Sequence, residues 1–300
     1  MSTVLPDVLP PTAAALTEAT SIEQASHIQR LDIATPLRDR PVPTTYVKRG
    51  TGGTPILLLH GFDSSVLEFR RLQPLLASHR ETWAVDLLGF GFTERGEDLS
   101  FSPSDIEAHL YGFWQAAIAK PVVLVGASMG GAAAIDFALT YPEAVEKLVL
   151  LDSAGIGTGP VVGKYLFPPL DYFAAEFLRR PGVRNNISYT AYFDKQFNSE
   201  DARCCAALHL ECDRWNRALI SFTKSGGYPS FKSQLPDLDV PTLILWGEDD
   251  KILGTKDASE FYRLIPNSKL VWIPCCGHVP HLERPNTTAR RILEFVEFKK

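Results

Sequence analysis

The sequence contains no run of about eighteen apolar residues, the length that a membrane-spanning helix requires. It also lacks an excess of basic charge, because 35 acidic side chains outnumber 30 basic ones and give a net charge of −5. These absences predict that the chain neither spans a membrane nor binds nucleic acid. The N-terminus has no basic segment ahead of an apolar stretch, so it does not resemble a signal peptide. We therefore expect a soluble, cytoplasmic protein.

Cysteine is scarce and irregularly placed. An odd number of cysteines without a Cys-x-x-Cys pair argues against both a disulfide framework and a zinc site. The motifs described below require neither a cofactor nor a metal, and we expect none. The five cysteines, which we interpret as reduced thiols, are Cys204, Cys205, Cys212, Cys275 and Cys276.

Strand and helix patterns alternate along much of the chain. The apolar run 55–59 is typical of a strand buried on both faces of a parallel sheet. Helical patterns follow it and separate further strand-like runs at 82–86, 121–127 and 147–152. This alternation predicts an α/β fold with a mostly parallel sheet and helices on both of its faces. With 45% hydrophobic residues, 300 residues can build such a core together with an inserted module.

The alternation stops at residues 156–236, which are rich in aromatic side chains and contain no strand-like run. We interpret this stretch as an inserted helical cap. One long helix over 201–225 would place Trp215, Leu219 and Phe222 on a single stripe, and we predict that they bind substrate. The predicted division of the chain is a flexible N-terminal arm at 1–28, the first part of the core at 29–155, the cap at 156–236 and the second part of the core at 237–300.

The stretch Gly126-Ala-Ser128-Met129-Gly130 connects an apolar strand to a helix of small residues. In this strand–turn–helix context, a Gly-x-Ser-x-Gly sequence predicts a sharp turn that exposes a nucleophilic serine. The two glycines permit close approach of strand, turn and helix. The Met129 N–H, at the start of the helix, is positioned to donate to an oxyanion.

Three further motifs accompany this turn: His60-Gly61-Phe62, Trp246-Gly247-Glu-Asp-Asp250, and Gly277-His278-Val-Pro-His281. Together the four motifs resemble those of the serine-type α/β-hydrolases that have a helical cap, over roughly residues 44–298. The resemblance implies an α/β-hydrolase fold with a Ser128, Asp250 and His278 triad, which appears in the family's chain order. It also implies that the N–H groups of Phe62 and Met129 form an oxyanion hole.

Two assignments within these motifs have a neighbouring competitor. The spacing from Trp246 selects Asp250 as the acid, but the adjacent Asp249 remains an alternative. His281 competes with His278; because the family's catalytic histidine directly follows a glycine, we interpret His281 as a structural hydrogen-bonding residue near Glu283.

These observations predict an esterase that acts on a small-molecule ester with an apolar acyl or alcohol group, through an acyl-enzyme. The aromatic cap favours such a substrate over a sugar or a peptide. Similar triads also serve C–C bond hydrolases and cofactor-free perhydrolases, so these are alternative activities. A non-catalytic member that senses a ligand is a further alternative. The turn at 60–71 and the run at 83–92 also resemble a branch from oxygenic phototrophs, which would imply prenyl-alcohol or other lipid esters as substrates.

Overall fold

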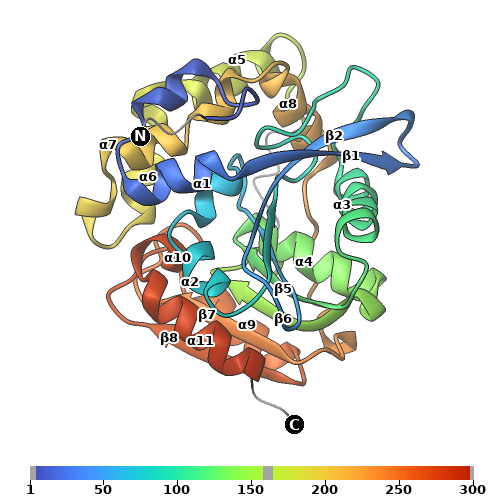
Figure 1. The fold of residues 1–300 in the computed structure, drawn as a ribbon, viewed down its shortest axis with the longest axis vertical. Helices are drawn as coiled ribbons and strands as arrows, with labels where there is room; N and C mark the ends of the chain where they lie inside the picture. Colours follow the sequence, from blue (N-terminus) through green and yellow to red (C-terminus); the bar gives the residue numbers. More distant parts are fainter. Residues whose placement is uncertain (1–4, 158–164, 298–300) are drawn as a thin grey trace.

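An eight-stranded sheet forms the centre of the molecule, as Figure 1 shows. The structure is a computed structural model that describes residues 5–157 and 165–297. The predicted α/β-hydrolase fold with its mostly parallel sheet is confirmed. The strands are β1 (Ile28–Thr35), β2 (Arg38–Arg49), β3 (Ile56–Leu59), β4 (Thr82–Val85), β5 (Val122–Ala127), β6 (Val145–Leu151), β7 (Thr242–Gly247) and β8 (Ser268–Ile273).

The strand order is β1-β2-β4-β3-β5-β6-β7-β8. β2 pairs antiparallel with both β1 and β4, whereas every pair from β4 to β8 is parallel. In a parallel sheet the carboxyl ends of the strands meet at one edge. The segments that follow β3, β5, β7 and β8, which carry the four motifs, therefore start from the same edge of the sheet.

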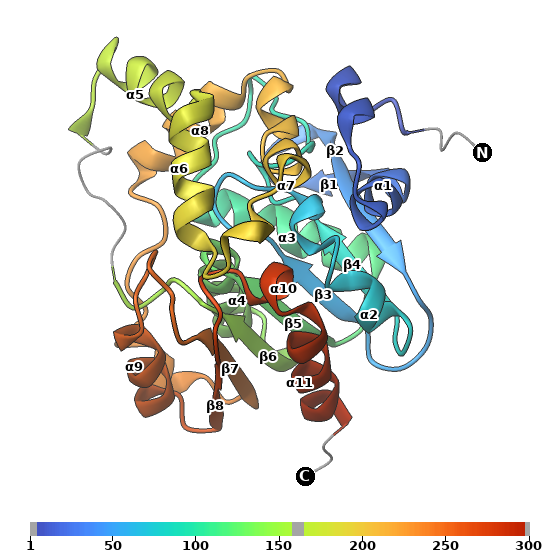
Figure 2. The ribbon, with the colours of Figure 1, turned by 90° about the vertical axis from the view of Figure 1, so that its left-hand side faces the viewer.

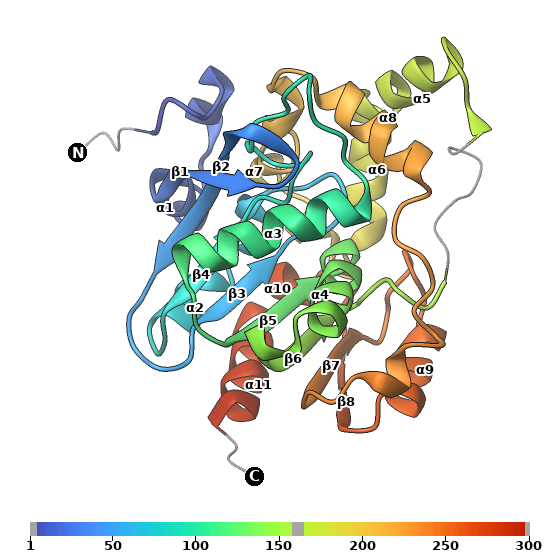
Figure 3. The same cartoon turned by 90° about the vertical axis from the view of Figure 1, so that its right-hand side faces the viewer.

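Helices cover both faces of this sheet (Figures 2 and 3). The helices α3, α4 and α9 contribute to one hydrophobic cluster, and α2 and α11 contribute to the other. The helices of the core are α1 (Ala19–Ser26), α2 (Gln73–Ala77), α3 (Pro103–Ala117), α4 (Met129–Thr140), α9 (Lys256–Leu264), α10 (Pro280–Glu283) and α11 (Pro285–Glu297). Short 3-10 helices are η1 (Pro11–Ala15), η2 (Val66–Phe69), η3 (Pro142–Ala144) and η7 (Leu235–Asp237).

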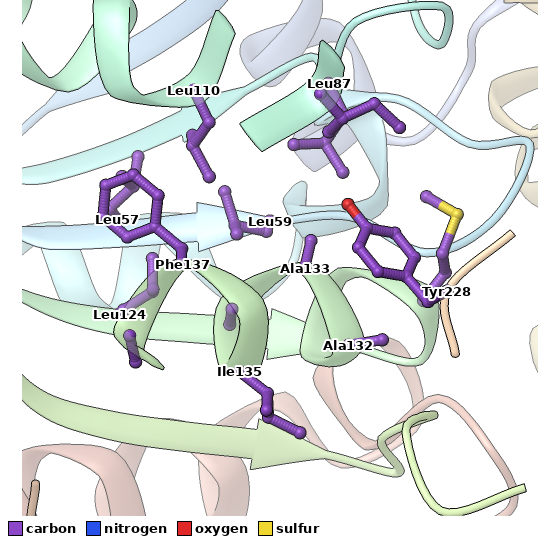
Figure 4. Close-up of a cluster of buried hydrophobic side chains, with 14 of the residues drawn as sticks. Leu57, Leu59, Leu87, Leu110, Leu124, Ala132, Ala133, Ile135, Phe137 and Tyr228 are labelled. Atoms are coloured by element: carbon purple, nitrogen blue, oxygen red, sulfur yellow. The ribbon is translucent and has the colours of Figure 1, made fainter. Parts of the chain in front are cut away.

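Alternate residues of the buried strands enter the two clusters, as the pleat of a strand requires. In β3, Leu57 and Leu59 face α3 and α4, whereas Ile56 and Leu58 face the opposite cluster. Figure 4 shows the first cluster, in which Tyr228 reaches the core from the last part of the predicted cap. Burial on both faces explains why these strands have continuous apolar sequences.

The N-terminal segment differs from the predicted flexible arm. From residue 5 onward it contains η1 and α1, and Leu9, Leu16 and Ala25 are buried in the same cluster as α2 and α11. The Thr17 and Glu18 N–H groups donate to Asp201 in the cap, at 2.5 and 2.8 Å. Buried apolar residues and hydrogen bonds to Asp201 therefore hold this segment against the rest of the protein, although its composition suggested a loose arm.

The chain between β6 and β7 is helical, and it lies over the edge of the sheet in Figures 2 and 3. The described residues do not include 158–164, which belong to the predicted cap. They also do not include 1–4 of the predicted arm or 298–300 of the predicted second core part. The elements of this region are α5 (Leu170–Arg179), α6 (Pro181–Ala191), η5 (Lys195–Phe197), α7 (Glu200–Cys205), η6 (Leu208–Glu211) and α8 (Trp215–Ser225).

The predicted single helix over 201–225 was wrong, because the structure divides this stretch into α7, η6 and α8. Arg214 has a φ of 59°, a left-handed conformation that a continuous helix does not allow. The break brings His209 and Trp215 to the same carboxylate, that of Asp63. In an unbroken helix, residues six positions apart would point in directions about 120° apart. Across the described ranges, no helix is both long and apolar enough to cross a membrane.

Candidate active site

Ser128 occupies the sharp turn between β5 and α4. Its backbone has φ 51° and ψ −118°, a combination that is strained for a residue with a side chain. Three hydrogen bonds hold the turn: the Ser128 N–H donates to Leu151 O at 3.0 Å, and its carbonyl accepts from Gly131 and Ala154, each at 2.9 Å. The neighbouring strand and the new helix therefore fix the strained conformation.

The turn is tight because two glycines allow backbones to touch. A Cβ at Gly126 would lie 2.2 Å from the Gly130 carbonyl oxygen, and a Cβ at Gly130 would lie 2.2 Å from that of Leu59. Either side chain would push α4 away from β3 and β5. The glycines thereby bring the helix N-terminus, with its unpaired N–H groups, beside the end of β3.

His278 and Asp250 form a direct contact beyond the ends of β8 and β7. The His278 Nδ1 lies 2.9 Å from Asp250 Oδ2, and both side chains are buried. The other oxygen, Asp250 Oδ1, accepts from the N–H groups of Ile252 at 2.7 Å and Leu253 at 3.1 Å. A carboxylate so placed fixes the tautomer that leaves the histidine Nε2 free to accept a proton. No contact of this kind is present for Asp249, whose N–H bonds to Cys276 O at 2.9 Å.

A second buried carboxyl, Asp152 at the end of β6, lies beside this pair. Its Oδ1 accepts from the Gly247 N–H at 2.9 Å. Burial, and then the charge of Asp250, raise the pKa of Asp152 well above its usual range. Burial and the neighbouring carboxylate thus both disfavour the charged form of Asp152. Atoms of Asp152, Asp250 and His278 lie within 4.8 Å of one another, a spacing that a metal ion could also use.

The turn after β3 approaches the serine. A Cβ at Gly61 would lie 3.5 Å from that of Ser128, so the backbone of this turn passes next to the nucleophile. The Gly61 N–H donates to Glu68 Oε2 at 2.9 Å, and His281 Nε2 lies 3.0 Å from Glu68 Oε1. Burial raises the pKa of Glu68, but the hydrogen bond and charge of His281 outweigh it and lower this pKa to about 2. His281 thus pairs with Glu68 rather than with the Glu283 suggested by the sequence.

The two predicted oxyanion donors belong to the turns after β3 and β5. Met129 is the first residue of α4, so its N–H has no partner within the helix. Phe62 directly follows Gly61, and its ring is 44% exposed, packing 5.9 Å from the ring of Phe90. Among the residues that the structure describes, the Ser128 hydroxyl makes no hydrogen bond to His278. Such contacts are often long before substrate binds.

The next residue of the turn, Asp63, connects it to the cap. Its Oδ1 accepts from Trp215 Nε1 at 2.7 Å and from His209 Nε2 at 3.0 Å, and its Oδ2 from Arg184 Nη1 at 2.5 Å. Although burial opposes ionisation, His209, then Arg184 and Trp215, hold the pKa of Asp63 below its usual range. One buried carboxylate therefore joins α6, η6 and α8 to the turn that carries Phe62.

A second carboxylate joins the cap to the histidine loop. The buried side chain of Glu283 accepts from the Gly277 N–H at 2.8 Å and from the cap N–H groups of Phe193 at 3.1 Å and Asp194 at 2.6 Å. The His278 N–H itself donates to Ala191 O, at the end of α6, at 2.7 Å. The cap is thus hydrogen-bonded to the loop that holds the candidate base.

The three predicted substrate-binding residues lie in two different hydrophobic clusters. Trp215 and Leu219 pack with Ala175 in a separate cluster inside the cap. Phe222 belongs to the main cluster, and its ring centroid lies 5.8 Å from that of Phe62. Only Phe222 therefore adjoins the candidate oxyanion hole.

Sequence reasoning did not assign a role to four carboxyls that shape this site. Each of them has at least one partner far away in the chain, which no local spacing reveals; they are Asp63, Glu68, Asp152 and Glu283. A hollow of about 360 Å³, lined by Arg71 and Phe197 among others, contains Glu283 but none of the predicted site residues.

Comparisons with known proteins place this arrangement in a family. A model of the alpha/beta hydrolase family matches residues 56–291. The alpha/beta hydrolase domain-containing protein VTE7 of Arabidopsis thaliana is 34% identical over 248 residues, which span 82% of this chain and 75% of that protein. The 2-hydroxy-6-oxo-6-(2'-aminophenyl)hexa-2,4-dienoic acid hydrolase of Metapseudomonas resinovorans is 32% identical over 267 residues, or 85% and 88% of the two chains.

Solved structures agree with this placement. A thermophilic esterase from Thermogutta terrifontis has a TM-score of 0.76 and 26% identity, covering 89% of this chain and 98% of its own. A serine hydrolase involved in carbazole degradation has a TM-score of 0.74 and 26% identity, covering 91% and 100%. Because the family model spans well over half of the sequence and both relatives exceed 30% identity, this chain belongs to the alpha/beta hydrolase family.

Proposed function

We propose that this protein hydrolyses carboxylic esters that carry an apolar acyl or alcohol group. The observation that carries the proposal is the buried contact between His278 and Asp250, at the same sheet edge as the strained Ser128 turn. A serine hydroxyl is a weak nucleophile at neutral pH and needs a base that a third group orients. The similarity to an esterase of known structure supports this choice.

In the proposed reaction, the Ser128 hydroxyl oxygen attacks the ester carbonyl carbon while its proton passes to His278 Nε2. Asp250 stabilises the imidazolium, and the N–H groups of Phe62 and Met129 bind the negative oxygen. His278 then returns the proton to the departing alcohol, which leaves an acyl group on Ser128. Water, deprotonated by the same histidine, attacks the acyl carbonyl carbon; the bond to the Ser128 oxygen then breaks, this oxygen takes the proton back from His278, and the acid is released.

Asp152, whose pKa is raised by burial and by Asp250, has a supporting role in this proposal. A hydrogen bond from its carboxyl to Asp250 would limit how strongly that carboxylate holds the imidazolium, and would keep its oxygens in place. Phe222, beside Phe62, is the proposed contact for the apolar part of the substrate, whereas Trp215 and Leu219 hold the cap together.

Cleavage of a C–C bond is the second candidate. The observation that favours it is the 32% identity to a 2-hydroxy-6-oxodienoate-type hydrolase over most of both chains. Perhydrolysis uses the same triad with peroxide in place of water, and a ligand-sensing member would keep the pocket without turnover.

A substrate panel separates these activities. The wild-type protein is assayed with p-nitrophenyl esters of increasing acyl length and with a 2-hydroxy-6-oxodienoate, and Ser128→Ala is the matched control. We expect ester turnover that increases with acyl length and falls about a thousandfold or more in the variant. Faster cleavage of the dienoate would favour the C–C activity. A folded wild-type protein that cleaves none of these compounds would contradict the proposal.

A further inference from the structure

Large apolar side chains are exposed mainly in one segment of the cap. Of the thirteen such side chains in residues 5–157 and 165–297, nine lie within residues 165–193. Among them, Phe167 is 66% exposed, Phe173 63% and Phe177 52%. Isolated exposed apolar residues are ordinary, but a concentration of this kind on one segment marks a surface that meets an apolar partner.

The helix α5 has apolar residues on two sides. On its inner side, Ala175 and Leu178 pack against α8 in the cluster that contains Trp215. On its outer side, Leu170, Phe173 and Phe177 follow helical spacing and form one exposed stripe. Figures 2 and 3 show α5 at the outer corner of the cap, away from the sheet.

Charge on this segment favours an anionic partner. Its two carboxylates are engaged within the cap, since Asp171 pairs with Lys224 and Glu176 with Arg179 at 3.7 Å. Arg180 instead lies 5.5 Å from the Phe177 ring centroid, on the exposed side. The outer stripe therefore combines aromatic rings with a cation, although the whole chain has a net charge of −5. This combination fits a lipid headgroup region that contains anionic lipid.

Exposed apolar side chains also occur next to the candidate catalytic residues. Three of the four that lie outside residues 165–193 are Phe62, Ile252 and Leu253. Phe62 belongs to the oxyanion turn, and the N–H groups of the other two donate to Asp250. Phe193, at the end of the segment, donates to the carboxylate that also binds the Gly277 N–H. The segment that carries the exposed apolar side chains is thus hydrogen-bonded, through Glu283, to the loop that holds the candidate base.

We propose that the outer face of α5 docks reversibly on an anionic lipid surface and holds the candidate active site close to it, so that apolar esters are taken from the lipid phase. Only the second half of this statement rests on the proposed ester hydrolysis. A single amphipathic helix and one or two cations give reversible rather than permanent attachment.

The test is co-sedimentation of the full chain with vesicles of phosphatidylcholine alone or mixed with phosphatidylglycerol. The double variant Phe173→Ser, Phe177→Ser removes two exposed rings and has no contact with the triad. Tyr262→Ser is the matched control, because Tyr262 is 55% exposed on α9, outside this segment. Binding is measured without turnover, so its failure is distinct from failure of the proposed function.

We expect the wild type and Tyr262→Ser to bind the mixed vesicles equally, and the double variant to bind at least about tenfold more weakly. Arg180→Gln should weaken binding to mixed vesicles only. All variants should cleave a short water-soluble ester as the wild type does. Wild-type protein that stays in the supernatant would overturn the proposal. A wild-type dimer that the double variant converts to monomer would also overturn it, because a second copy would then cover the stripe.

Discussion

Core and cap differ in what determines their elements. The core strands that precede Ser128 and Asp250 are apolar runs buried on both faces, so the sequence of each is sufficient to define it. In the cap, a contact with the core sets the start of a helix instead. The helix α8 begins after Arg214, which has a left-handed conformation, and this start brings Trp215 to Asp63. The core therefore carries the candidate catalytic residues, whereas buried carboxylates hold the cap and the core against each other.

The largest expected effect lies entirely in the core. Asp250→Asn should lower kcat by about a thousand- to ten-thousandfold, because an amide at this position favours the wrong histidine tautomer. Asp249→Asn is the matched control, since its side chain does not contact His278 and it should retain near-normal kcat. Steady-state kinetics on one activated ester compares the two variants. Equal losses of kcat in both variants would show that the observed contact between His278 and Asp250 does not identify the catalytic acid.

The junction of core and cap should give the next largest effect. Asp63→Asn places an amide N–H₂ against the Arg184 guanidinium and should lower kcat about ten- to hundredfold by displacing the Phe62 turn. Thermal unfolding should show a loss of stability as well, because a buried charged partner is left unpaired.

A double-mutant cycle with Arg184→Gln distinguishes this coupling from general damage. Because both variants break the same ion pair, the losses in the double variant should be far from additive. Additive losses in kcat would contradict a functional connection between the cap and the oxyanion turn. A change confined to stability would show that Asp63 only holds the cap in place.

Within the cap, only one side of α8 should influence substrate choice. Phe222→Ala removes the ring beside Phe62 and should shift the preference between short and long acyl esters by about tenfold. Leu219→Ala, the matched control, should cost about 2–5 kcal/mol of stability through its cavity in the cap and leave the acyl-length profile unchanged. A profile altered equally in both variants would show that the whole cap, rather than Phe222, lines the substrate site.

The smallest effect concerns the stability of the core. Burial lowers the pKa of His109 to about 3, and its Nε2 lies 2.7 Å from Thr44 Oγ1. The unfolded chain, with a histidine pKa near 6.5, binds this proton first, so the contribution of His109 is lost as pH falls below about 6.5. His109→Gln does not titrate and keeps a donor. The stability of the wild type relative to this variant should fall by about 2 kcal/mol between pH 7 and pH 5 in denaturant titrations. Equal pH slopes for the two proteins would show that His109 is not buried in its neutral form.

What the sequence could predict follows the same division. The α/β fold and the glycine-bounded turn at Ser128 could be predicted, because continuous apolar runs and a local motif determine them. The family's spacing from Trp246 selected Asp250 but left Asp249 as an alternative, because adjacent residues share the same loop and only the three-dimensional path shows which one meets His278. The roles of Asp63 and Glu283 could not be predicted either, because their partners in the cap lie far away in the chain.

The order in the N-terminal segment was also hidden from composition. Its alanines and leucines are too sparse to predict a core element, and Asp201, which accepts from Thr17 and Glu18, belongs to the cap. Contacts between regions that are distant in sequence therefore account for most of what sequence analysis missed.

The central claim is that the core performs covalent catalysis through Ser128. The most direct measurement is the mass of the protein after a reaction with an activated ester is stopped with acid, followed by peptide mapping. We predict an added mass equal to the acyl group, located on the peptide that contains Ser128 and absent from Ser128→Ala. An unmodified Ser128 peptide during rapid turnover, or an acyl group on another residue, would contradict the account.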